Sequence, residues 1–178
     1  MTTTIQIDRM PEPGACVAGL RQLLDELLVA VHDCPAGDVV VLVGQIEDDL
    51  VDATSALEGV EAALASVPRL VAEERVAAAA AAAGDGQRRL AGLCTLFGER
   101  LASPQRLQHV ADLARTRGPG WAGWSKVVHR LLSGWPGAMR AAQEMLAELW
   151  KFLVTRAAGM RSAPAPLAAD ARIATQRN

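Results

Sequence analysis

The sequence predicts an all-α protein, an antiparallel bundle of six to seven helices around one long central helix. Three observations lead to this prediction. Apolar residues recur at alternating steps of four and three through residues 39–67, which is the heptad spacing of a coiled-coil seam. Alanine, a strong helix former, supplies much of the 51% hydrophobic content. Tyrosine is absent and phenylalanine occurs only twice, a composition that disfavours sheets.

The central helix is expected over residues 38–67, with Asp38 as its N-cap. Its seam consists of Val39, Val43, Ile46, Leu50, Ala53, Leu57, Val60, Leu64 and Val67. The run Val39–Val43 also has strand propensity, so a buried strand is the alternative there, although the seam continues through it in register. A helix this long with one apolar face needs other helices to cover it.

Glycine and proline divide the first half of the chain. Residues 1–13 are expected to form a flexible N-terminal leader, and a first helix is expected over residues 15–33. Pro68 is expected to end the central helix and open an alanine-rich helix over residues 69–83. This segment has few large side chains, so we expect it to be the least firmly packed and able to detach. Gly84-Asp85-Gly86 is expected to stop it.

The second half is divided in the same way. A helix is expected over residues 87–101, and Ser103-Pro104 is an N-cap followed by proline that opens another, to residue 115. Gly118-Pro119-Gly120 and Gly134–Gly137 are expected breaks on either side of a helix over residues 121–132. The last helix is expected over residues 138–158. Residues 14–158 then form a single domain, and residues 159–178 a disordered tail rich in alanine, proline and arginine.

Composition points to a reduced, cytoplasmic protein. No apolar run reaches the ~18 residues needed to cross a bilayer, and the N-terminus shows no signal-peptide pattern. Cys16, Cys34 and Cys94 are an odd set without metal-type spacing, so no cofactor is expected.

The two halves of the chain carry opposite charge. Residues 1–86 hold 15 acidic and 4 basic side chains, whereas residues 87–178 hold 14 basic and 5 acidic ones. Such a division is typical either of a basic face for nucleic acid or membrane, or of acidic helices that pack beside basic helices. The near cancellation of the charges favours the second interpretation.

One acidic cluster offers a metal-binding hypothesis. Asp48, Asp49 and Asp52 lie at spacings that place carboxylates on one side of a helix, where Mg²⁺ could bind. The run Asp48-Asp49-Leu50-Val51-Asp52 resembles the aspartate-rich motif of all-helical isoprenoid synthases, which implies a Mg²⁺-dependent enzyme that handles diphosphates. The rest of the chain departs from that family, because the only asparagine is Asn178 and aromatic residues are few. A solvated acidic face is the structural alternative.

A second hypothesis is DNA binding. Residues 106–132 faintly resemble a helix-turn-helix, in which Arg115, Arg117, Lys126 and Arg130 would meet phosphates. The connecting turn is long and contains proline, so a plain helical hairpin is the alternative.

The last helix suggests a partner surface. Trp150 lies beside Leu149 and Phe152, and with Met145 these side chains widen the apolar face of that helix. We expect them to contact another protein or a second copy of the chain.

No nucleophile motif, glycine-rich phosphate loop or paired metal motif occurs in the sequence. We therefore predict a non-enzymatic, adaptor-like or regulatory interaction protein, with the DNA-binding regulator and the Mg²⁺-dependent enzyme as alternatives.

Overall fold

The structure, a computed structural model, describes residues 10–35 and 40–162, and all regular secondary structure in these ranges is helical. The predicted all-α bundle is therefore confirmed. The elements are α1 (Gly14–His32), α2 (Val40–Ala65), α3 (Val67–Ala72), α4 (Val76–Leu96), a π-helical turn η2 (Phe97–Leu101), α5 (Pro104–Thr116) and α6 (Pro119–Ser162). The predicted cap Asp38, residues 1–9 of the leader and residues 163–178 of the tail lie outside the described residues.

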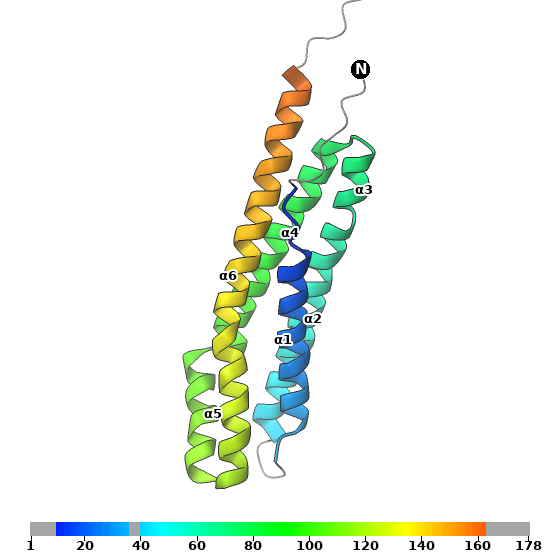
Figure 1. Ribbon diagram of the computed structural model, residues 1–178. Coiled ribbons are helices and arrows are strands. Elements are labelled where there is room, and N and C mark those ends of the chain that lie inside the picture. Colours follow the sequence, from blue (N-terminus) through cyan, green and yellow to red (C-terminus); the bar gives the residue numbers. More distant parts are fainter. Residues whose placement is uncertain (1–9, 36–39, 163–178) are drawn as a thin grey trace, which may run out of the picture.

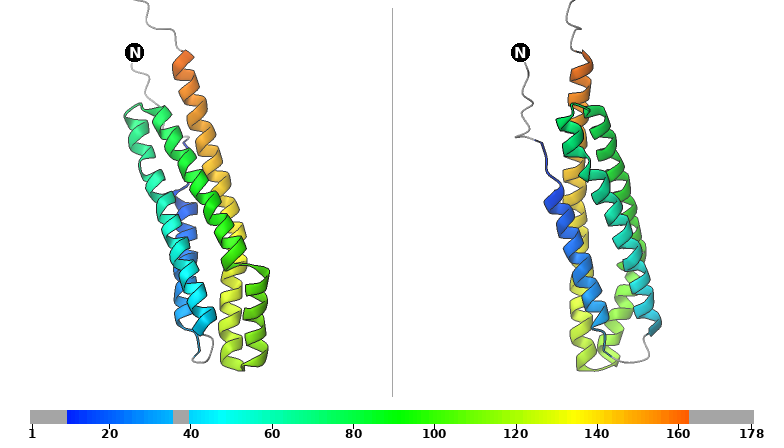
Figure 2. Two further views of the ribbon diagram at one scale, coloured as in Figure 1. Left: turned by 180° about the vertical axis from the view of Figure 1, so that it is seen from behind. Right: turned by 90° about the vertical axis from the view of Figure 1, so that its right-hand side faces the viewer.

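The helices pack antiparallel into an elongated bundle (Figure 1). α1 and α6 lie side by side on one face, and α2 and α4 lie on the opposite face, as the reversed view in Figure 2 shows. α4 runs along the upper half of α6, and α5 runs along its lower half. The lower half is therefore built from α1, α2, α5 and α6, whereas α4, α6, α3 and the end of α2 form the upper half.

The organising helix is not the predicted one. α2 spans 26 residues, close to the expected 38–67, but α6 spans 44 residues and packs against α1, α4 and α5. Within the described ranges there are five helices longer than ten residues, plus the short α3, instead of six to seven around α2. The count was wrong because two predicted breaks are absent.

The first absent break is Gly84-Asp85-Gly86, which lies inside α4. Gly86 is buried, and a Cβ atom there would come within 3.3 Å of the Leu64 side chain. Glycine at this position lets α4 approach α2 closely, which is a packing role. The chain breaks earlier instead, at Glu74, whose φ of 57° is left-handed.

The second absent break is Gly134–Gly137, because α6 continues through Pro136. Proline removes one helical hydrogen bond. Tertiary packing holds both sides of this position, since Leu132, Trp135 and Met139 are all buried. Packing energy therefore outweighs the local preference that the sequence alone reveals.

Other boundaries are confirmed. The first helix and α5 match their predicted ranges within a residue or two, and Ser103 caps α5 by accepting a hydrogen bond from the backbone N–H of Arg106 at 3.3 Å. Residues 40–43 are helical, so the strand alternative is wrong for them.

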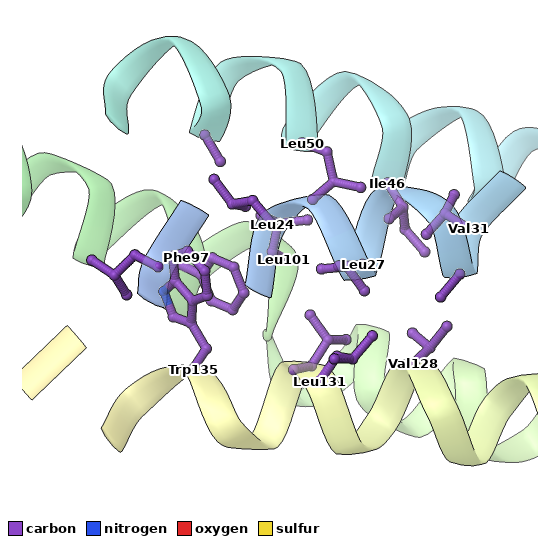
Figure 3. Close-up of a cluster of buried hydrophobic side chains, with 14 of the residues drawn as sticks. Leu24, Leu27, Val31, Ile46, Leu50, Phe97, Leu101, Val128, Leu131 and Trp135 are labelled. Atoms are coloured by element: carbon purple, nitrogen blue, oxygen red, sulfur yellow. The ribbon is translucent and has the colours of Figure 1, made fainter. Parts of the chain in front are cut away.

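The main core fills the lower and middle bundle (Figure 3). Trp135 of α6 stacks on Phe97 of η2, with ring centroids 3.9 Å apart and planes at 9°. Leu24 and Leu27 of α1 and Leu50 of α2 are almost fully buried beside them. From the predicted α2 seam, the buried residues Ile46, Leu50, Ala53, Leu57 and Val60 belong to this core.

A second, smaller core occupies the upper half. It joins Leu70 and Val71 of α3 to Leu149 and Leu153 of α6 across the alanines of α4. Ala79 and Ala83 have no exposed surface, so the alanine-rich segment is packed closely even though it contributes little apolar area.

Candidate functional site

The acidic cluster of α2 divides between the interior and solvent. Asp49 is buried, with a side chain only 5% exposed, and its carboxylate pairs with Arg106 at 2.5 Å and with Arg100. Asp52 accepts a hydrogen bond from Arg100 at 2.9 Å. Asp48 is exposed. Asp49 and Asp52 are therefore engaged by arginine, whereas Asp48 faces solvent.

The π-helical turn positions the arginines. η2 ends at Leu101, where the backbone N–H of Ala102 donates to the carbonyl of Phe97 at 2.7 Å. Arg100 belongs to this turn, and Arg106 lies in the first turn of α5. Both arginines pair directly with Asp49. These three residues, together with Asp48 and Ser103, line a polar cavity of about 400 Å³.

This arrangement does little to support a metal centre. Each oxygen of Asp49 faces a guanidinium, which is the partner that satisfies a buried carboxylate. In residues 10–35 and 40–162, no group of three or more His, Cys, Asp or Glu side chains is placed to hold a metal ion. The sequence predicted a basic helix beside the acidic flank of α2, with Arg100 and Arg106 among the candidate residues, but it did not assign these two to Asp49. The opposite charge of the two halves was the pattern that pointed to such pairs.

The predicted partner residues do not share one face of α6. At 100° per residue, Trp150 lies about 160° around the helix from Phe152. Phe152 and Met145 are partly buried, and Phe152 packs against the upper core. Trp150 is 40% exposed.

Trp150 lies over α4. A Cβ atom on Gly84 would come within 3.3 Å of the indole Nε1, so the ring packs closely against Gly84. Val154, one turn further along α6, is also exposed at 39%. Exposed tryptophan against a helix backbone forms a firm apolar surface, of the kind that is enriched in protein interfaces.

The predicted DNA-binding residues lie on a helical hairpin. α5 and α6 run antiparallel side by side, joined at Gly118, whose φ is 96° (Figure 1). In a helix-turn-helix the two helices cross steeply. Arg115 pairs with Asp112 of its own helix, which lowers the pKa of that carboxyl. Arg117 is exposed at the end of α5.

Lys126 and Arg130 lie elsewhere, both exposed on α6, and Arg130 lies toward α1. Arg130 lines a shallow groove of about 400 Å³ between the two helices, and Lys126 is one helical turn away. The opposite wall of the groove is acidic, with Asp25, Glu26 and Asp33 of α1. Sequence reasoning missed this juxtaposition, because the contact between α1 and α6 could not be predicted.

Two thiols are partly shielded. Burial raises the pKa of Cys94, and burial together with the charge of Glu47 raises the pKa of Cys34. Such thiols are less ionised than exposed ones, which does not favour nucleophilic catalysis at these positions.

Comparison with known proteins gives no match: neither a protein family, nor a curated protein, nor a solved structure resembles this chain significantly. Among the helices that the structure describes, none combines the length and apolar character needed to cross a membrane.

Proposed function

We propose that this chain is a non-enzymatic, adaptor-like helical module that acts in the cytoplasm through protein–protein contacts. The observation that supports the proposal best is the exposed pair Trp150 and Val154 on the surface formed by α4 and α6. Trp150 packs on Gly84 but leaves 40% of its surface exposed, and a large aromatic surface is costly to leave in water.

The polar groups support the same conclusion. The most buried carboxylate, Asp49, is engaged by two arginines, and Arg21 of α1 binds Glu61 of α2 at 2.6 Å. These pairs join separate helices, so the charges have a structural use. The apolar residues on the surface are what a partner could bind.

The test uses a photo-reactive amino acid placed at Val154, next to Trp150, in the cells that produce the protein. We expect one protein to be crosslinked from this position, and we expect the crosslink to be lost in a Trp150→Ala variant. The matched control places the same amino acid at Val51. This residue is 65% exposed and belongs to α2, not to the surface formed by α4 and α6.

A specific crosslink at 154 that depends on Trp150 would support the proposal and identify the partner. No crosslink at 154, or equal crosslinking at 154 and 51, would contradict it. Circular dichroism of the Trp150→Ala variant checks that a lost crosslink does not reflect unfolding.

A further inference from the structure

The groove between α1 and α6 has walls of opposite charge. Asp25, Glu26 and Asp33 form the acidic wall on α1, and Arg130 lines the groove from α6. Lys126 is exposed one helical turn before Arg130, outside the groove lining, and we call these two residues the basic wall. Arg130 and the acidic wall lie at the same height along the bundle because they line one groove. Among the residues that the structure describes, Asp33, Lys126 and Arg130 form no ion pair. Their charges are therefore available to a partner.

The floor of the groove is apolar. Val29 of α1 is 61% exposed and Val127 of α6 is 38% exposed, with Ala30 and Leu131 beneath them. An apolar centre between charged rims has the anatomy of a protein interface. α1 and α6 lie side by side on the same face of the bundle (Figure 1).

We propose that this face binds a second copy of the chain, about a two-fold axis parallel to the long axis of the bundle. The charges select this occupant, since each wall is complementary to the other. A parallel two-fold keeps heights unchanged and sets α1 of one copy against α6 of the other. Asp33 and Glu26 then face the partner's Lys126 and the partner's Arg130, while the exposed valines meet in the centre.

The other symmetric arrangement is unfavourable. A two-fold axis perpendicular to the helices would set α1 against α1 and α6 against α6, which opposes like charges along both walls. The charge pattern therefore favours a two-fold axis parallel to the bundle over one that is perpendicular to it.

The dimensions of α1 and α6 limit the size of the interface. α1 has 19 residues, which corresponds to a length of about 28 Å. Two packed helices are about 20 Å wide, so the face covers at most about 560 Å² in each copy, or about 1,100 Å² together. Stable interfaces bury about 1,200–2,000 Å². We therefore expect a reversible dimer with a Kd of about 1–100 µM, weakened by salt.

The test is sedimentation velocity of the full chain over a dilution series that spans this range. Reversing the acidic wall (Glu26→Lys with Asp33→Lys) or the basic wall (Lys126→Glu with Arg130→Glu) leaves a face of mostly one sign. We expect each variant to raise the Kd at least about tenfold. The matched control reverses two exposed acids outside the groove (Asp48→Lys with Glu74→Lys) and should keep the dimer.

The decisive variant carries all four substitutions of the two walls. In this variant the α1 wall is basic and the α6 wall is acidic. With a parallel two-fold axis, opposite charges again face each other, so the dimer should form as in the wild type. With a perpendicular axis, like charges would still be opposed. A wild-type chain that stays monomeric throughout, or walls whose reversal changes nothing, would overturn the proposal.

This inference rests on the proposed function, because it takes the chain to be an interaction module. The two can fail separately. Sedimentation uses the pure protein and the groove of α1 and α6, whereas crosslinking from 154 uses the surface of α4 and α6 in cells.

Discussion

The ion pairs of Asp49 give the sharpest stability prediction. In Asp49→Asn the side chain keeps its shape but loses its charge, so Arg106, which is only 13% exposed, is left without its carboxylate. Arg100 is half exposed and keeps Asp52 as a partner. Breaking a fully buried pair costs about 3–5 kcal/mol. Because Arg106 keeps some contact with solvent, we expect the free energy of unfolding to fall by about 2–3 kcal/mol.

Urea unfolding followed by circular dichroism measures this loss, and the Tm should fall by about 4–12 °C. Asp48→Asn is the matched control on the neighbouring residue. Asp48 is exposed, so its replacement should change stability by less than about 0.5 kcal/mol.

A double-mutant cycle isolates the pair. Asp49→Ala and Arg106→Ala should each destabilise the fold, and the double variant should lose clearly less than their sum. Additive losses, or an Asp49→Asn variant as stable as Asp48→Asn, would refute the view that this pair joins α2 to α5.

Four further predictions concern glycines, thiols, hydrogen exchange and metal binding. Gly92→Ala should stabilise α4 by about 0.5–1 kcal/mol in urea unfolding, because a Cβ there meets nothing within 4 Å; Gly118→Ala should destabilise by about 1 kcal/mol, because φ is 96°. Cys34 and Cys94, whose raised pKa values reduce the thiolate fraction, should react with iodoacetamide at pH 8 more slowly than in the urea-unfolded chain, and equal rates would contradict their shielding. Amides of residues 76–83 should exchange faster than those of residues 50–57, because the alanine core buries little apolar area, and equal protection would show that the segment does not detach. Mg²⁺ with inorganic diphosphate should leave the Tm unchanged, because Asp49 and Asp52 are engaged by arginine; a clear rise would revive the enzyme hypothesis.

Local patterns were sufficient to predict much of the fold. The heptad seam of α2, the helical boundaries of α1 and the Ser103-Pro104 start of α5 follow from spacing and capping, which depend on residues near in sequence. The predicted breaks at Gly84 and Pro136 are wrong because these positions depend on residues that are distant in sequence. What keeps the helix intact there is packing against distant residues, such as Leu64 beside Gly86 and Phe97 beside Trp135.

The candidate sites were predicted less completely. The sequence indicated that Trp150 would widen the apolar face of its helix, but not that Gly84 lies beneath it. It indicated that acidic and basic helices would pack together, but not which of the basic residues would pair with Asp49. Residue types can be read locally, whereas pairings between helices require the tertiary arrangement.

The continuity of α6 through Pro136 has a consequence for how the proposed contacts combine. Val127 in the lower groove and Trp150 in the upper half lie on one uninterrupted helix of 44 residues, about 35 Å apart. A dimer about an axis parallel to this helix carries both Trp150 side chains at the same end. Such a dimer is bivalent, so a partner with two binding sites would gain avidity from a high effective concentration without any additional contact.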